Sequence, residues 1–157
     1  MNIYTVKAIV ILDNDGKRII AKYYDETFSS TKEQAAFETK LFSKTNKVIL
    51  LDGLICLYRS NVDLFFYVIG DGGENELMLL HVLNCLYDST SQILRKNVEK
   101  KALLDNLDVV ILAIDEVCDS GVILETDAST ICSRIVTKSD DLTFSEQSVA
   151  QVGMQVR

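Results

Sequence analysis

Histidine, cysteine and paired carboxylates could support catalysis or metal binding in this chain, but their spacing predicts neither. There is one histidine, His81, and the four cysteines form no C-x-x-C pair: Cys56, Cys85, Cys118 and Cys132. A zinc site needs about four clustered ligands. Most of the cysteines lie in apolar stretches, so we expect buried thiols in a reducing compartment. Carboxylates from distant segments can still converge in a fold. The residues in sequence order nevertheless predict no enzyme, no cofactor and no metal site.

Two glycine-containing turns resemble ligand-binding loops, and both fail on spacing or charge. With Gly16 as the sixth position of a calcium loop, Ile11 falls where the first carboxylate must stand. The Gly70–Gly73 turn precedes a helix and could cradle a phosphate, but Asp71, Glu74 and Glu76 surround it with negative charge. We interpret the first as a hairpin turn and the second as a strand-to-helix turn.

Charge and composition exclude several classes of partner. The 157 residues carry a net charge of −7, and 48% of them are hydrophobic, as in a globular domain. An acidic chain is repelled by nucleic-acid phosphates and by anionic lipid headgroups. Neither a signal peptide nor an apolar run of about 18 residues is evident. We therefore expect a soluble cytosolic protein that binds no nucleic acid and reaches membranes only through a partner.

The first half of the chain predicts five strands, with one helix between the second and the third. β-Branched stretches at Tyr4–Leu12 and Arg18–Tyr24 predict a hairpin. Thr31 and Gln34 predict a capping box for a helix that ends near Ser43. Three further extended segments follow, at Lys47–Leu51, Leu54–Ser60 and Val62–Gly70. The last is apolar on both faces, so helices must cover both sides of the sheet.

The stretch Glu74–Arg95 predicts the principal helix. Its polar side chains gather in an arc about 100° wide, and apolar side chains fill most of the remainder. A surface helix needs an apolar stripe only a little over about 100° wide, and the apolar arc of this helix is about twice as wide. We therefore expect this helix to contact a sheet, a second helix and, on one flank, another polypeptide.

The second half is less clearly patterned. Val98–Asn106 predicts a short helical turn, whereas Leu107–Cys118 suits either a strand or a helix buried nearly all round. Val122–Glu125 is extended. Asp127 then caps a last helix whose expected inward face is Ile131, Ile135 and Val136. From these patterns we assign a domain to residues 1–138 and a polar tail to residues 139–157, in which Thr143–Glu146 is a second capping box before a short docking helix.

Several of these stretches together resemble a known family. They are YTVKAIVILDNDGKRIIAKYY, VDLFFYVIGDGGENELMLLHVLNCLYDSTSQILRKNVEKKALLDN, AIDEVCDSGVILETD and LTFSEQSVAQV. Over almost the whole chain they resemble the zeta subunits of coatomer, the COPI vesicle coat, and more distantly the small chains of clathrin adaptors. ENELMLL, LRKNVEK and DEVCDSGVILE are the most specific. The chain stops at GMQVR, where relatives are expected to continue with a further amphipathic segment.

The resemblance implies a fold and a role. The fold is α/β in the α+β sense: a longin-like, three-layer α/β/α domain with a five-stranded antiparallel sheet, one helix on one face and two or more on the other. It also favours a helix for Leu107–Cys118. The implied role is a structural subunit that forms a heterodimer with the trunk of the coatomer gamma subunit.

The same resemblance implies a cellular setting. The coat carries cargo from the Golgi to the endoplasmic reticulum and within the Golgi, and a GTP-bound Arf-family protein recruits it, mainly through larger subunits. We expect the flank Leu80, Leu83, Tyr87 and Leu94 to contribute to partner contact, or else to pack against the chain's own Leu107–Cys118 helix. The alternative function is a longin-type regulator or binding module for a small GTPase.

Overall fold

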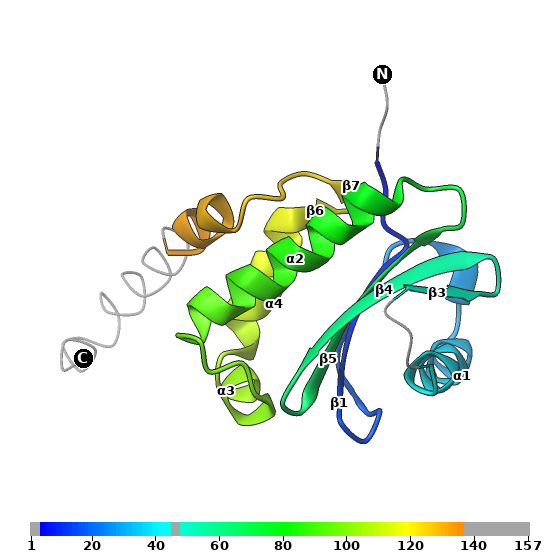
Figure 1. The fold of residues 1–157 in the computed structure, drawn as a ribbon, viewed down its shortest axis with the longest axis horizontal. Coiled ribbons are helices and arrows are strands. Elements are labelled where there is room, and N and C mark those ends of the chain that lie inside the picture. Colours follow the sequence, from blue (N-terminus) through cyan, green and yellow to red (C-terminus); the bar gives the residue numbers. More distant parts are fainter. Residues whose placement is uncertain (1–3, 45–47, 137–157) are drawn as a thin grey trace.

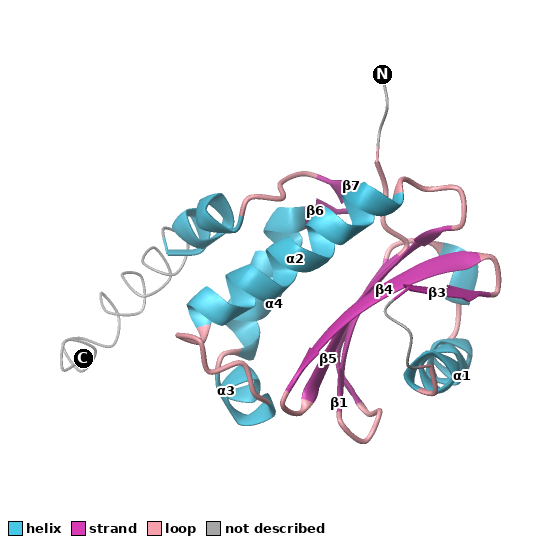
Figure 2. Ribbon diagram, in the orientation of Figure 1, coloured by secondary structure: helices cyan, strands magenta, loops and turns pink. Residues whose placement is uncertain are grey.

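A computed structural model describes residues 4–44 and 48–136 of the chain. Its centre is a five-stranded sheet with the order β2-β1-β5-β4-β3, and all neighbours are antiparallel. The strands are β1 (Ala8–Asp13), β2 (Arg18–Tyr23), β3 (Val48–Leu51), β4 (Leu54–Asn61) and β5 (Leu64–Asp71). The five-stranded antiparallel sheet is therefore confirmed (Figures 1 and 2).

Tight turns join β1 to β2, β3 to β4 and β4 to β5, as the sequence indicates. Gly16 has φ +80° in the β1–β2 turn, and Asp52 and Gly53 have φ +54° and +79° in the β3–β4 turn. Positive φ at both central residues matches the twist of a two-residue hairpin and is cheap for Asp-Gly. The calcium-like loop is thus an ordinary hairpin turn, closed by Asp13, whose Oδ1 accepts from the backbone N–H groups of Asp15 and Lys17.

Helices cover the two faces of the sheet unequally. On one face, α1 (Thr31–Phe42) packs through Phe37 and Leu41 on a core that includes Val10, Leu12 and Tyr67. On the other face lie α2 (Glu76–Ile93), α3 (Lys100–Asp105), α4 (Leu107–Val117) and a last helix at residues 128–136 (Figure 1). β5 is buried between the two layers, which confirms the three-layer α/β/α prediction.

The ambiguous segment at Leu107–Cys118 is helical, and it ends in a small second sheet. α4 runs beside α2 and buries Val110, Ala113, Ile114 and Val117. The two-stranded sheet is β6 (Cys118–Asp119) with β7 (Val122–Ile123), and Thr5 pairs with Val122. Packing against α2 and the sheet therefore outweighs the strand propensity of the Val109–Ile114 run.

Two local predictions are wrong, each by a small displacement. The N-cap of α1 is Ser30 rather than Thr31: its hydroxyl accepts from the Glu33 backbone N–H at 3.1 Å. Gln34 instead donates to the Phe28 carbonyl. In the last helix Ile131 and Ile135 are buried as expected, but Val136 is 58% exposed because the core ends one residue earlier.

The polar tail and the predicted helix after Thr143 lie outside the described residues, as does the boundary between residues 138 and 139. All three expectations stay predictions. Among the helices that the structure describes, none combines the length and the apolar character needed to cross a membrane.

Candidate partner-binding surface

The helix α2 buries one side against the domain and leaves another open. Asn75 caps its start, accepting from the backbone N–H groups of Leu77 and Met78, so the Gly70–Gly73 segment is a strand-to-helix turn. The helix packs on β5, β4 and α4. Its buried residues are Leu79, Val82, Leu83, Cys85, Leu86, Ser89 and Thr90. The wide apolar arc is thus explained in large part by a sheet beneath and a helix alongside.

The four predicted contact residues divide into two pairs. Leu83 and Leu94 are only 2% and 5% exposed and belong to the core between the sheet and the helices. Leu80 is 41% exposed, and Tyr87 is half-buried. Only Leu80 and Tyr87 of the predicted flank are therefore available at the surface of this chain.

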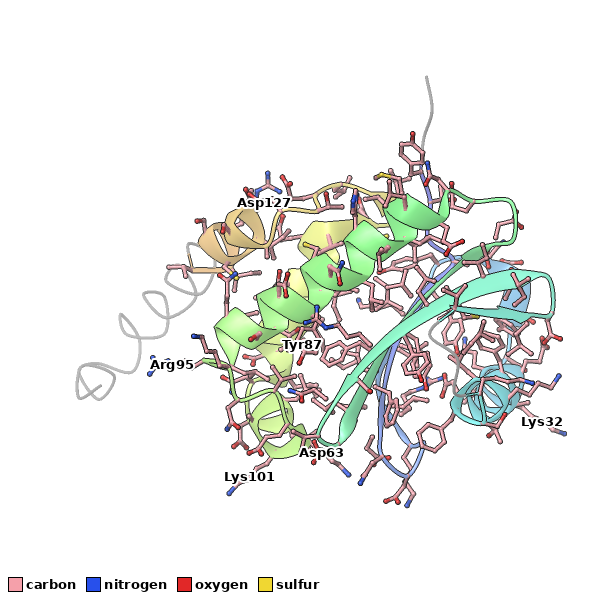
Figure 3. The ribbon with its side chains drawn as sticks, in the orientation of Figure 1. Lys32, Asp63, Tyr87, Arg95, Lys101 and Asp127 are labelled. Atoms are coloured by element: carbon pink, nitrogen blue, oxygen red, sulfur yellow. The ribbon has the colours of Figure 1, made fainter. Side chains whose placement is uncertain are left out.

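Tyr87, labelled on α2 in Figure 3, makes contacts on two sides. Its ring and that of Phe66, on β5, form a T-shaped contact with a centroid distance of 5.4 Å. The guanidinium carbon of Arg59, on β4, lies 3.7 Å from the Tyr87 ring centroid. Arg59 also contacts Asn84 at 3.3 Å and Asp88 at 3.6 Å. These contacts fix the side of α2 that faces β4, where Leu77 and Leu80 are the exposed aliphatic residues, at 58% and 41%.

Sequence reasoning missed several exposed aliphatic residues, and two of them lie on β3. Val48 and Leu50 of β3 are 46% and 75% exposed. Their position on the outer strand of the sheet is what exposes them, and sequence alone does not reveal which strand is outermost. The one sequence signal for their exposure is the alternation of faces along a strand, which places Val48 and Leu50 on the face opposite to the buried Ile49.

The groups that could do chemistry are dispersed or buried. Burial raises the pKa of the Cys56 thiol to about 12 and the pKa values of the Cys85 and Cys118 thiols to about 11. His81 is exposed and lines an open polar hollow with Asn84 and Asp88. Within residues 4–44 and 48–136, no three His, Cys, Asp or Glu side chains are placed to hold a metal ion.

The arrangement of one helix, a five-stranded antiparallel sheet and several helices is the fold of an adaptor small chain. A solved assembly described as a homology model of the full-length AP-3 complex in a stretched open conformation contains a chain that superposes with a TM-score of 0.65. The match covers 94% of this chain and 99% of that one. Its sequence identity is 17%, so the match supports the fold alone.

Sequence comparison carries the assignment further. The family model for the clathrin adaptor complex small chain matches residues 5–142. The chain is 56% identical over 155 residues to the human coatomer subunit zeta-1, covering 96% of this chain and 88% of that protein. It is 41% identical to coatomer subunit zeta-1 of Arabidopsis thaliana, covering 93% and 88%. The chain belongs to the adaptor small-chain family and, within it, to the coatomer zeta subunits.

Proposed function

We propose that this chain is a non-enzymatic structural subunit of the coatomer coat that forms a heterodimer with the trunk of the gamma subunit. The observation that carries the proposal is 56% identity to human coatomer subunit zeta-1 along 96% of the chain. Members of the adaptor small-chain family are components of coats, and the exposed aliphatic residues beside α2 suit a chain that is covered in an assembly.

In this proposal the chain acts in transport from the Golgi to the endoplasmic reticulum and within the Golgi. It is cytoplasmic and lies at Golgi membranes and COPI-coated vesicles as a peripheral part of the complex. The link to a GTP-bound Arf-family protein and to the membrane runs through the larger subunits. The net charge of −7 supports such indirect recruitment, because an acidic chain is repelled by anionic lipid headgroups.

The surface proposed for gamma contact is the exposed part of the predicted flank, Leu80 together with Tyr87. Leu83 and Leu94 support it from below as core residues. A hydrophobic side chain left 41% exposed on a helix, on the same face as an aromatic ring held by Arg59, is the kind of site that anchors an interface.

The test is binding to a recombinant gamma trunk, with the full chain and with two matched variants. Leu80→Asp places a charge on the proposed surface, whereas Leu104→Asp places the same charge on α3, where the leucine is 49% exposed. We expect Leu80→Asp to weaken binding at least about tenfold and Leu104→Asp to bind as the natural chain does.

Leu83→Asp separates a role in folding from a role in binding. Its side chain is 2% exposed, so a charge there should unfold the isolated chain. Leu80→Asp should leave the thermal midpoint within a few degrees of the natural one. If Leu80→Asp is folded and still binds gamma normally, this surface is not the site of contact.

A further inference from the structure

The strand β3 ends the sheet on one side and presents an uncovered aliphatic surface. Within the described residues no strand pairs with its outer edge. Val48 and Leu50 point to the same face as their cross-strand partners, Leu57 and Ile55, which belong to the core under α2. α2 packs on β5 and β4, so that core face of the sheet continues onto β3, where none of the helices that the structure describes lies above it.

The backbone of Leu50 is oriented outward. The two-residue turn at Asp52–Gly53 makes Leu51 and Leu54 a hydrogen-bonded pair, and the pairs then alternate along the ladder. Ile49 therefore exchanges hydrogen bonds with Cys56, while Leu50 lies opposite Ile55 in a non-hydrogen-bonded pair. Its N–H and C=O consequently point away from β4, toward the open edge.

Leu80 lies on the same side of the molecule as this edge. Leu79 occupies the space above Gly70, where an added Cβ would come within 2.7 Å of its Cδ1. Gly70 pairs with Ile55, and Ile55 pairs with Leu50, so these residues form one row across the sheet. Leu80 follows Leu79 by about 100° around the helix, on the flank that Tyr87 and Arg59 mark as facing β4. We call Val48, Leu50 and Leu80 the β3 strip.

The opposite edge of the sheet is protected in a way that β3 is not. β2 carries Arg18, which is paired with Glu38, and Lys22, which is paired with Asp115 at 3.1 Å. Charged side chains on an outer strand oppose pairing with another strand. β3 reads Val-Ile-Leu-Leu and has none. Of the two edges, β3 is the one suited to accept a further strand.

We propose that the β3 strip receives an extended segment of the partner subunit, which adds a sixth strand to the sheet beside β3. The segment hydrogen-bonds to the N–H and C=O of Leu50, and its alternate aliphatic side chains cover Val48, Leu50 and Leu80. The uncharged β3 side chains favour an apolar segment over an acidic or basic one. This inference rests on the proposed pairing with gamma and specifies how part of that pairing is made.

Hydrogen exchange at β3 tests strand addition directly. The chain is compared alone and in complex with the recombinant gamma trunk, with exchange followed in fragments that contain Leu50. We expect exchange at Leu50 to slow at least about tenfold in the complex, because its N–H gains a protein acceptor. An unchanged rate in a complex that has formed overturns strand addition and leaves the proposed heterodimer intact.

A pair of variants separates the backbone of Leu50 from its side chain. Leu50→Ala and Leu50→Pro both remove the aliphatic contact, but only proline also removes the outward N–H, at a position where no ladder bond to β4 is lost. We expect gamma binding to weaken about tenfold for Leu50→Ala and about a further fivefold for Leu50→Pro. Circular dichroism establishes that each variant is folded, and the exchange measurement on the natural chain does not depend on either.

Three other outcomes overturn the proposal. Equal affinities for folded Leu50→Ala and Leu50→Pro would mean that the partner covers the strip without pairing with the strand. Protection of Leu50 that rises with concentration in the chain alone would assign the edge to a second copy. If no complex with gamma forms, this inference and the proposed function both fail.

Discussion

The guanidinium of Arg59 stacks over the ring of Tyr87, 3.7 Å from its centroid, and joins β4 to α2. Arg59 makes its ion pair with Asp88 on the same helix. Because the arginine is 42% exposed, we expect Arg59→Ala to lower the free energy of unfolding by only about 1 kcal/mol.

A double-mutant cycle isolates this contact. Arg59→Ala, Tyr87→Leu and the double variant are unfolded in urea, and the expected coupling energy is about 0.5–1 kcal/mol. Additive effects would show that Arg59 acts through Asp88 and Asn84 and not through the ring.

The buried carboxylate of Glu38 should matter more for stability. It accepts from the Tyr23 hydroxyl at 2.7 Å and from Arg18 Nε at 3.1 Å, and its side chain is 7% exposed. Glu38→Ala leaves the Tyr23 hydroxyl without its acceptor and Arg18 with Gln34 in place of a carboxylate, so we expect a loss of about 3 kcal/mol in unfolding free energy. Lys32→Ala, at an exposed position of the same helix, should stay within about 0.5 kcal/mol. Similar values for the two variants would contradict the assigned role of Glu38.

Much of this architecture could be predicted from local pattern, and the rest depends on contacts between distant segments. The Asp-Gly turns and the doubly apolar β5 segment predict the hairpins and a sheet covered on both faces. The helix at Leu107–Val117 could be predicted only from the family resemblance. Its residues have strand propensity, and packing on α2 makes them helical.

The predicted contact surface shows the same limit. Apolar character alone predicts one contact surface from four residues of α2 and its end: Leu80, Leu83, Tyr87 and Leu94. Whether each is buried depends on how far the sheet, α3 and α4 extend beneath α2. Leu83 and Leu94 fall inside that boundary and Leu80 outside it. The exposure of Leu50 depends likewise on β3 being the outermost strand.

Asp13 should make stability depend on pH. Its burial acts to raise the pKa, but hydrogen bonds from Lys100 Nζ and from the Lys17 and Asp15 backbone outweigh it, so the pKa of Asp13 is lowered. A lowered folded-state pKa stabilises the fold above the unfolded value of about 4. That contribution is lost as pH falls through the folded-state pKa.

Asp13→Asn checks this dependence. The amide keeps an acceptor for the turn but loses the charge that faces Lys100, so we expect a loss of about 1–2 kcal/mol at pH 7. The difference from the natural chain should shrink as the pH is lowered from 5 to 2, as measured by urea unfolding. A difference that is independent of pH would show that the turn geometry, and not the charge, is responsible.

The cysteines should differ in reactivity. Burial raises the pKa of all four thiols, but Cys56, Cys85 and Cys118 are fully buried whereas Cys132 is half-buried and accessible to a reagent. At pH 8 we expect a thiol reagent to label Cys132 first, and the other three only as the protein unfolds. Cys132→Ser should remove the fast phase, and all four thiols should react in guanidinium. Rapid labelling of Cys56 in the folded chain would contradict its burial.

The most direct test of the central claim is size-exclusion chromatography with light scattering on this chain mixed with the recombinant gamma trunk. The coat-subunit proposal predicts a single 1:1 complex that survives dilution. Separate elution of the two chains, with this one a stable monomer, would contradict the proposal.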